Sequence, residues 1–149
     1  MNSEQEIDLF DFYQDLDTND DIVFTVRTLL LTRMAKDILH RQLCHLEQNE
    51  NFTASTSTYL RRLQRMMALL SNDLYYMKRY LKKEGVKVSD TPIEATRSYI
   101  NWSYWYKGRV AQTGGTPTQL KQQIKGLIVD YSKLEKEREQ DGKRNGLSF

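Results

Sequence analysis

The chain contains little cysteine, proline or glycine: one, two and seven residues of 149. A single cysteine cannot close an intramolecular disulfide, so the sequence fits a reducing compartment and predicts a cytoplasmic protein. An all-β protein with many tight turns needs more proline and glycine, so these counts favour long helices. The chain also lacks the layout of a signal peptide and any apolar run of membrane-spanning length, which predicts no membrane association.

Groups of side chains that could carry chemistry are equally scarce. His40, Cys44 and His45 lie within six residues, and His40 and Cys44 are one helical turn apart. A zinc site normally takes three or four protein ligands, and the chain has no second cysteine or third histidine. A Cys–His nucleophilic pair needs an orienting third group, for which the sequence offers no candidate. We therefore predict no metal, no cofactor, no catalytic residue and no small-molecule substrate, and we expect that the protein is not an enzyme.

The residues that are present form helical patterns. The clearest is an apolar stripe with alternating spacings of three and four, which predicts a helix packed along one face: Leu60, Leu63, Met67, Leu70, Leu74, Met77 and Leu81. Gly85 follows this stripe and is expected to end the helix in a left-handed conformation. Such a stripe packs equally well inside one bundle or against a second copy, so it is compatible with a homodimer.

Two further segments begin with the same helix-capping pattern. Thr91-Pro92-Ile93-Glu94 and Thr116-Pro117-Thr118-Gln119 each offer a capping threonine, proline at the first helical position and an acid or amide at the third. We expect the first helix to stop before Gly114-Gly115. The second carries an apolar stripe from Leu120 to Leu134.

These patterns predict an all-α protein, a four-helix bundle with helices at about 19–47, 58–84, 92–112 and 117–139. The expected organisation is a short acidic N-terminal helix or arm over 1–17, a helical bundle domain over 18–140 and a flexible C-terminal tail over 141–149.

Charge is distributed unevenly along the chain. The net charge of +2 conceals eight acids and no base in residues 1–22, and eight bases against two acids in residues 60–88. Same-sign neighbours on one helix face repel each other unless something negative lies nearby. The negative group is either the acidic N-terminal segment, from the same or another subunit, or nucleic-acid phosphate. The candidate binding residues on this face are Arg61, Arg62, Arg65, Lys78, Arg79, Lys82 and Lys83.

Five aromatic residues fall within eight positions: Tyr99, Trp102, Tyr104, Trp105 and Tyr106. In a helix, Trp102 and Trp105 share one side with Tyr99 and Tyr106, which favours packing of this set on the bundle core. The alternative is a surface platform for a partner or for unpaired bases, with Trp102 and Trp105 as candidate residues.

Two functions of different class follow from these features. The first is a small non-enzymatic helical protein that acts through protein–protein interaction, as an adaptor, inhibitor or regulatory factor, with self-association as one form of it. The alternative is a nucleic-acid-binding protein that uses the basic face of the 58–84 helix. The mild net charge of +2 and the lack of a helix-turn-helix pattern favour the first.

Overall fold

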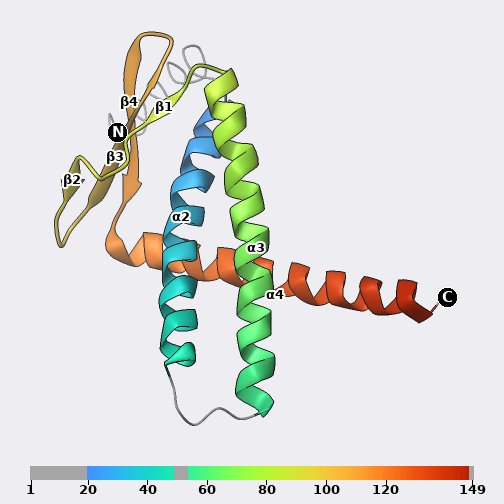
Figure 1. Ribbon diagram of the computed structural model, residues 1–149. Coiled ribbons are helices and arrows are strands. Elements are labelled where there is room, and N and C mark those ends of the chain that lie inside the picture. Colours follow the sequence, from blue (N-terminus) through green and yellow to red (C-terminus); the bar gives the residue numbers. More distant parts are fainter. Residues whose placement is uncertain (1–19, 49–53, 148–149) are drawn as a thin grey trace, which may run out of the picture. The chain divides into compact units, whose positions relative to one another are not determined.

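The described part of the chain combines three long helices with a small antiparallel sheet. A computed structural model describes residues 20–48 and 54–147 (Figure 1). In chain order the elements are α2 (Asp20–Glu47), α3 (Ala54–Lys83), β1 (Lys87–Val88), β2 (Glu94–Ala95), β3 (Ile100–Tyr106), β4 (Arg109–Gly115) and α4 (Pro117–Leu147). Within residues 20–48 and 54–147, no helix combines the length and the apolar character that crossing a membrane requires.

The predicted all-α four-helix bundle is wrong, because residues 92–112 form strands rather than a helix. This segment is rich in isoleucine, tryptophan and tyrosine, which favour strands. Apolar and polar residues also alternate from Ile100 to Tyr104, the period of a half-buried strand. A capping threonine contributes only about 1 kcal/mol, so the Thr91-Pro92 pattern is outweighed by the residues that follow it.

The other three predicted helices are present. Gly85 has a φ of 73°, as predicted for the left-handed residue that ends α3. The backbone N–H of Gly85 donates to Lys82 O at 3.2 Å, and that of Val86 donates to Leu81 O at 2.8 Å. α4 begins at Pro117 as predicted but continues to Leu147, into the segment that was expected to form a tail. The acidic arm predicted over 1–17 lies outside the described residues.

The chain divides into two compact units, which are described separately. Unit 1 comprises Met1–Leu29 and Met77–Thr116, and unit 2 comprises Leu30–Tyr76 and Pro117–Phe149.

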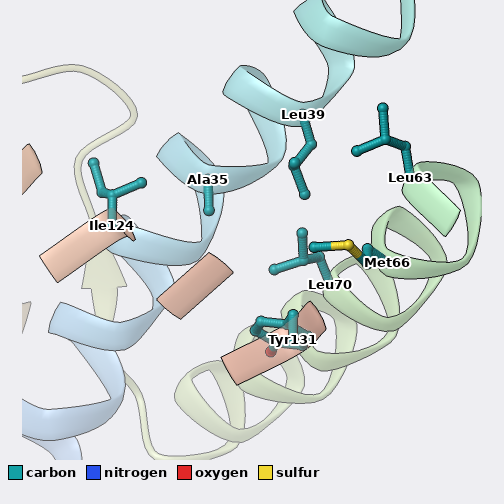
Figure 2. Packing of buried hydrophobic residues seen from close by; sticks show 7 residues of the cluster. All are labelled: Ala35, Leu39, Leu63, Met66, Leu70, Ile124 and Tyr131. Atoms are coloured by element: carbon teal, nitrogen blue, oxygen red, sulfur yellow. The ribbon is translucent and has the colours of Figure 1, made fainter. Parts of the chain in front are cut away.

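Unit 2 is built from helices. Residues 30–47 of α2, residues 54–76 of α3, and α4 enclose one buried cluster, in which Leu63 and Leu70 come from the predicted α3 stripe (Figure 2). α4 runs across the other two segments rather than alongside them (Figure 1). The cluster consists of Ala35, Leu39, Leu63, Met66, Leu70, Ile124 and Tyr131.

Unit 1 contains the sheet, whose central strand is β3. β4 pairs with one edge of β3, while β1 and β2 both pair with the other edge, all antiparallel. Val88 lies opposite Tyr104 and Glu94 opposite Asn101. Five residues lie between Val88 and Glu94, whereas only two lie between their partners Asn101 and Tyr104 on β3. β1 and β2 are therefore halves of one strand that is interrupted by a bulge. Thr91-Pro92 lies in this bulge, where the missing proline N–H costs no ladder hydrogen bond.

One face of the sheet and the first turns of α2 contribute side chains to the core of unit 1. Ile22, Val26 and Leu29 are buried and follow each other at spacings of four and three, which places them on one face of α2. The other buried apolar side chains of the unit are Leu81, Val86, Trp102, Tyr104 and Tyr106.

Candidate functional site

The β3–β4 hairpin is closed by the two-residue turn Lys107-Gly108. Both residues have positive φ, 52° and 74°, as in a type I′ turn, whose twist matches that of paired antiparallel strands. The turn sets Tyr106 opposite Arg109 and, one step along, Trp105 opposite Val110. The hairpin therefore determines which side chains share a face of the sheet.

The two tryptophans of the hairpin lie on opposite faces, because alternate residues of a strand point to opposite sides. Trp102 and Tyr104 point to the same face and are 6 % and 3 % exposed, and burial raises the pKa of the Tyr104 phenol. Trp105 lies on the other face and is 40 % exposed. The expectation that both tryptophans share one side therefore fails together with the predicted helix.

Trp105 is the centre of a row of side chains that crosses three strands. The strand register places Lys87 of β1 and Val110 of β4 directly opposite Trp105. The Lys87 Nζ lies 6.0 Å from the centre of the indole ring, within the range of a cation–π contact. Val110 is 59 % exposed. We call Lys87, Trp105 and Val110 the Trp105 row.

The same end of the sheet is basic. β1, β3, β4 and the hairpin turn together contain three bases, Lys87, Lys107 and Arg109, and no acid. Lys107 Nζ lies 5.2 Å from the centre of the Tyr106 ring. The exposed indole therefore lies in a locally positive environment.

β4 is an edge strand: among the strands of the described residues it pairs with β3 alone. Arg27 of α2 covers one end of this edge, since its Nη1 donates to Gly114 O at 3.1 Å and to Thr113 Oγ1 at 3.2 Å. Gly114 lies so close to β3 that a Cβ would overlap the Ile100 carbonyl oxygen and reach 2.8 Å from Asn101 Cα. An edge strand is a template for a further strand.

The predicted basic residues of α3 fall in both units. Arg61, Arg62 and Arg65 belong to unit 2, whereas Lys78, Arg79, Lys82 and Lys83 belong to unit 1. Arg62 is half-buried, and the other six residues are exposed.

Glu135 of α4 binds two of these arginines and was missed by the sequence reasoning. Its side chain is buried, and its Oε2 accepts from Arg62 Nε at 3.2 Å while its Oε1 accepts from Arg65 Nε at 2.6 Å. Arg62 Nη2 also donates to Ser132 Oγ at 2.7 Å. A signal was present, because Glu135 follows Tyr131 by four residues on the apolar face of α4, where a charge indicates a buried ion pair.

Unit 2 also has an open pocket of about 290 Å³, lined mainly by apolar side chains of its three helices. Two of its polar lining residues, Arg62 and Ser132, bond to each other. Arg62 and Ser132 thus join α3 to α4 at the lining of this pocket. Within the buried cluster, the Tyr131 hydroxyl donates to the Asp73 carboxylate. Burial, and then this hydrogen bond, raises the pKa of Tyr131.

The predicted His40–Cys44 proximity is present on α2, with Cys44 Sγ 3.6 Å from His40 Nε2. Among the side chains that the structure describes, no three histidine, cysteine, aspartate or glutamate residues gather where they could hold a metal ion.

The family model described as YhjD protein matches residues 17–136, a range that includes the whole sheet and the Trp105 row. No curated protein and no solved structure matches the chain.

Proposed function

The chain belongs to the YhjD protein family, and we propose that it acts by binding another protein through the Trp105 row rather than by catalysing a reaction. Its role is that of a small adaptor, inhibitor or regulatory factor. A cytoplasmic location is part of the proposal, because the single cysteine, Cys44, fits a reducing compartment.

The observation that carries the proposal is the exposure of Trp105. Trp105 is 40 % exposed, beside a valine, Val110, that is 59 % exposed. Tryptophan is among the residue types most enriched at the centres of protein interfaces. The I′ turn and the strand register hold the backbone of Trp105 in place, so few degrees of freedom remain to be lost on binding.

The expected partner surface is both apolar and acidic. The indole and Val110 offer apolar contact, while Lys87, Lys107 and Arg109 attract carboxylates and repel basic surfaces. The charge speeds the encounter and selects the partner, and the buried indole supplies most of the affinity.

The alternative, nucleic-acid binding, loses part of its support. Arg62 and Arg65 bind Glu135, and Trp102, at 6 % exposure, offers little surface for stacking on a base. The exposed group Lys78, Arg79, Lys82 and Lys83 still supports it. Binding of DNA or RNA that falls steeply with salt, and that is lost on charge reversal at Lys78 and Lys82, is the result that would favour this alternative.

The test compares three full-length baits in the same cell extract: the wild type, Trp105→Ser and Val129→Ser. Val129 on α4 is 50 % exposed, so its variant controls for the loss of an exposed apolar side chain. We expect the wild type and Val129→Ser to recover one partner equally, and Trp105→Ser to recover roughly tenfold less, the effect of about 1.4 kcal/mol of binding energy. Equal recovery by all three folded baits contradicts the proposal.

A further inference from the structure

The two outer edges of the sheet differ in how well they resist a further strand. On the edge formed by β1 and β2, a bulge interrupts the ladder and contains Pro92, which has no backbone N–H. Bulges, prolines and charges are the features that keep further strands away from an edge. β4 pairs with β3 without a bulge, contains no proline, and has its only charged residue, Arg109, at its start. Of the two edges, that of β4 is therefore the better template.

The hairpin geometry defines which part of the β4 edge is open. In a hairpin closed by a two-residue turn, every second residue of β4 directs its N–H and C=O groups away from β3, beginning with Val110. Gly114 is one such residue, and its outward carbonyl accepts from Arg27. Val110 and Gln112 are the other two, and both are exposed. The open length of the edge therefore offers the N–H and the C=O of these two residues.

A partner that covers Val110 must also satisfy its backbone. Val110 is the member of the Trp105 row that lies on the β4 edge, and it is 59 % exposed. A surface that buries this side chain from the edge removes water from the outward N–H and C=O groups, which is unfavourable unless they gain new hydrogen bonds. An extended strand supplies these bonds from its own backbone. A helix does not, because its backbone groups are bonded internally.

The side chains around the open edge indicate the composition of such a strand. Val110 lies on the same face as Trp105, so the residue that pairs with Val110 extends the Trp105 row and is expected to be apolar. The β3–β4 hairpin contains the bases Lys107 and Arg109 and no acid, and Lys107 is exposed. In an antiparallel strand, the residues that follow the apolar one run toward Lys107, so carboxylates are expected there.

We propose that the partner contributes an extended segment that adds to the outer edge of β4 as an antiparallel strand, with an apolar residue opposite Val110 and acidic residues after it. The inference rests on the proposed function and deepens it, since it states which kind of segment covers the Trp105 row. Main-chain hydrogen bonds to Val110 and Gln112 provide the pairing, and the side-chain contacts select the sequence and its register.

A synthetic peptide tests the pairing on the full-length, isotope-labelled chain. The probe is Ser-Val-Thr-Val-Glu-Glu-Glu with blocked ends, whose second valine is designed to pair with Val110 and whose first valine pairs with Gln112. At millimolar concentration we expect the amide signals of both residues to shift in a ¹H–¹⁵N NMR spectrum and to exchange more slowly with solvent. The Gly126 amide of α4 is expected to stay unchanged.

Backbone methylation of the probe supplies the matched control. Methyl groups on the amide nitrogens of both valines remove the donors that face β4, and we expect them to abolish the signal changes. Methyl groups on the amide nitrogens of the threonine and the first glutamate face away from β4, and we expect the changes to remain. The two peptides have the same composition, so they differ only in which edge of the added strand is blocked.

Charge reversal tests the acidic part of the proposal. We expect Lys107→Glu to weaken binding of the probe about fivefold, the scale of an exposed charge pair. Lys121→Glu, at an exposed position of α4, is the control and is expected to bind the probe like the wild type. A peptide with three lysines in place of the three glutamates is expected to bind the wild type more weakly than the probe does.

The inference is overturned if the probe leaves the Val110 and Gln112 signals in place, or if both methylated peptides behave alike. Equal binding of the probe by Lys107→Glu and Lys121→Glu overturns the acidic strand. Shifts of the same two signals with protein concentration alone, without a peptide, also count against it, because the edge is then covered by a second copy of the chain.

The two proposals fail separately. If Trp105→Ser loses its partner but the probe leaves Val110 and Gln112 unchanged, the binding function remains and the added strand is removed. If the probe adds to β4 but all three baits recover the partner equally, the edge accepts a strand and the proposed function is removed. Where both hold, an excess of the probe lowers recovery of the partner by the wild-type bait, and the peptide methylated at both valines does not.

Discussion

Arg65 donates from Nε to Oε1 of Glu135 at 2.6 Å, and the side chain that accepts is only 1 % exposed. Arg62 donates to the other oxygen of the same carboxylate. A buried carboxylate between two arginines is held by both partners, and removing it leaves positive charges facing each other. Part of the basic face of α3 is therefore an internal ion pair with α4.

Replacing Glu135 by glutamine is expected to lower the free energy of unfolding by roughly 1–3 kcal/mol, less than for a fully buried pair because the arginines remain partly in water. Urea denaturation followed by circular dichroism measures the change. Glu139→Gln is the control, since its carboxylate lies 3.6 Å from Arg65 Nη2 and is 39 % exposed. We expect that variant to lose at most about 0.5 kcal/mol, and equal losses in the two variants contradict the account.

Replacing each of two glycines by alanine should change the stability of the protein in opposite directions. At Gly114 the added Cβ overlaps the Ile100 carbonyl oxygen, so Gly114→Ala must force β4 away from β3. We expect this variant to lower the free energy of unfolding by about 2–4 kcal/mol. Gly126 lies inside α4 with nothing within 4 Å of an added Cβ. Gly126→Ala should therefore stabilise by roughly 0.5–1 kcal/mol. Thermal melts of both variants check this, and a Gly114→Ala protein as stable as the wild type disproves the close strand approach.

Tyr131 should make stability fall at high pH. Its pKa in the folded protein is raised above the ordinary value of 10.0, so the folded state keeps a proton that the unfolded chain has lost. The stabilisation is complete below pH 10 and is lost as the pH rises from there through the folded pKa. Tyr131→Phe is expected to cost about 1–2 kcal/mol at neutral pH and to flatten the fall above pH 10. Urea denaturation at several pH values measures both, and an unchanged slope in Tyr131→Phe contradicts the assignment.

A helix-capping pattern in this sequence predicts a helix correctly only where the residues after it also recur at helical spacing. Thr116-Pro117 and Thr91-Pro92 carry the same capping pattern, yet only the first begins a helix. After Pro117 the apolar residues recur at helical spacing from Leu120, whereas after Pro92 aromatic and β-branched residues alternate with polar ones. The cap contributes little energy on its own, so the longer pattern decides between helix and strand.

The candidate site was only partly predictable for the same reason. Trp105 was named among the candidate residues, but its exposure depends on the strand period, which separates it from Trp102. The contribution of Lys87 depends on pairing between β1 and β3 across seventeen intervening residues. No local pattern specifies such a register, since long-range strand pairing is set by turn geometry and by packing.

Contact between the exposed indole of Trp105 and a protein partner, as we propose it, can be measured directly. The chain has only two tryptophans, so their indole N–H signals in a ¹H–¹⁵N spectrum report separately on the exposed and the buried face of the hairpin. On addition of the partner recovered with the wild-type bait, we predict that the Trp105 indole signal shifts or broadens while the Trp102 signal stays in place. An unchanged Trp105 signal in the complex, or equal changes at both tryptophans, would contradict the account.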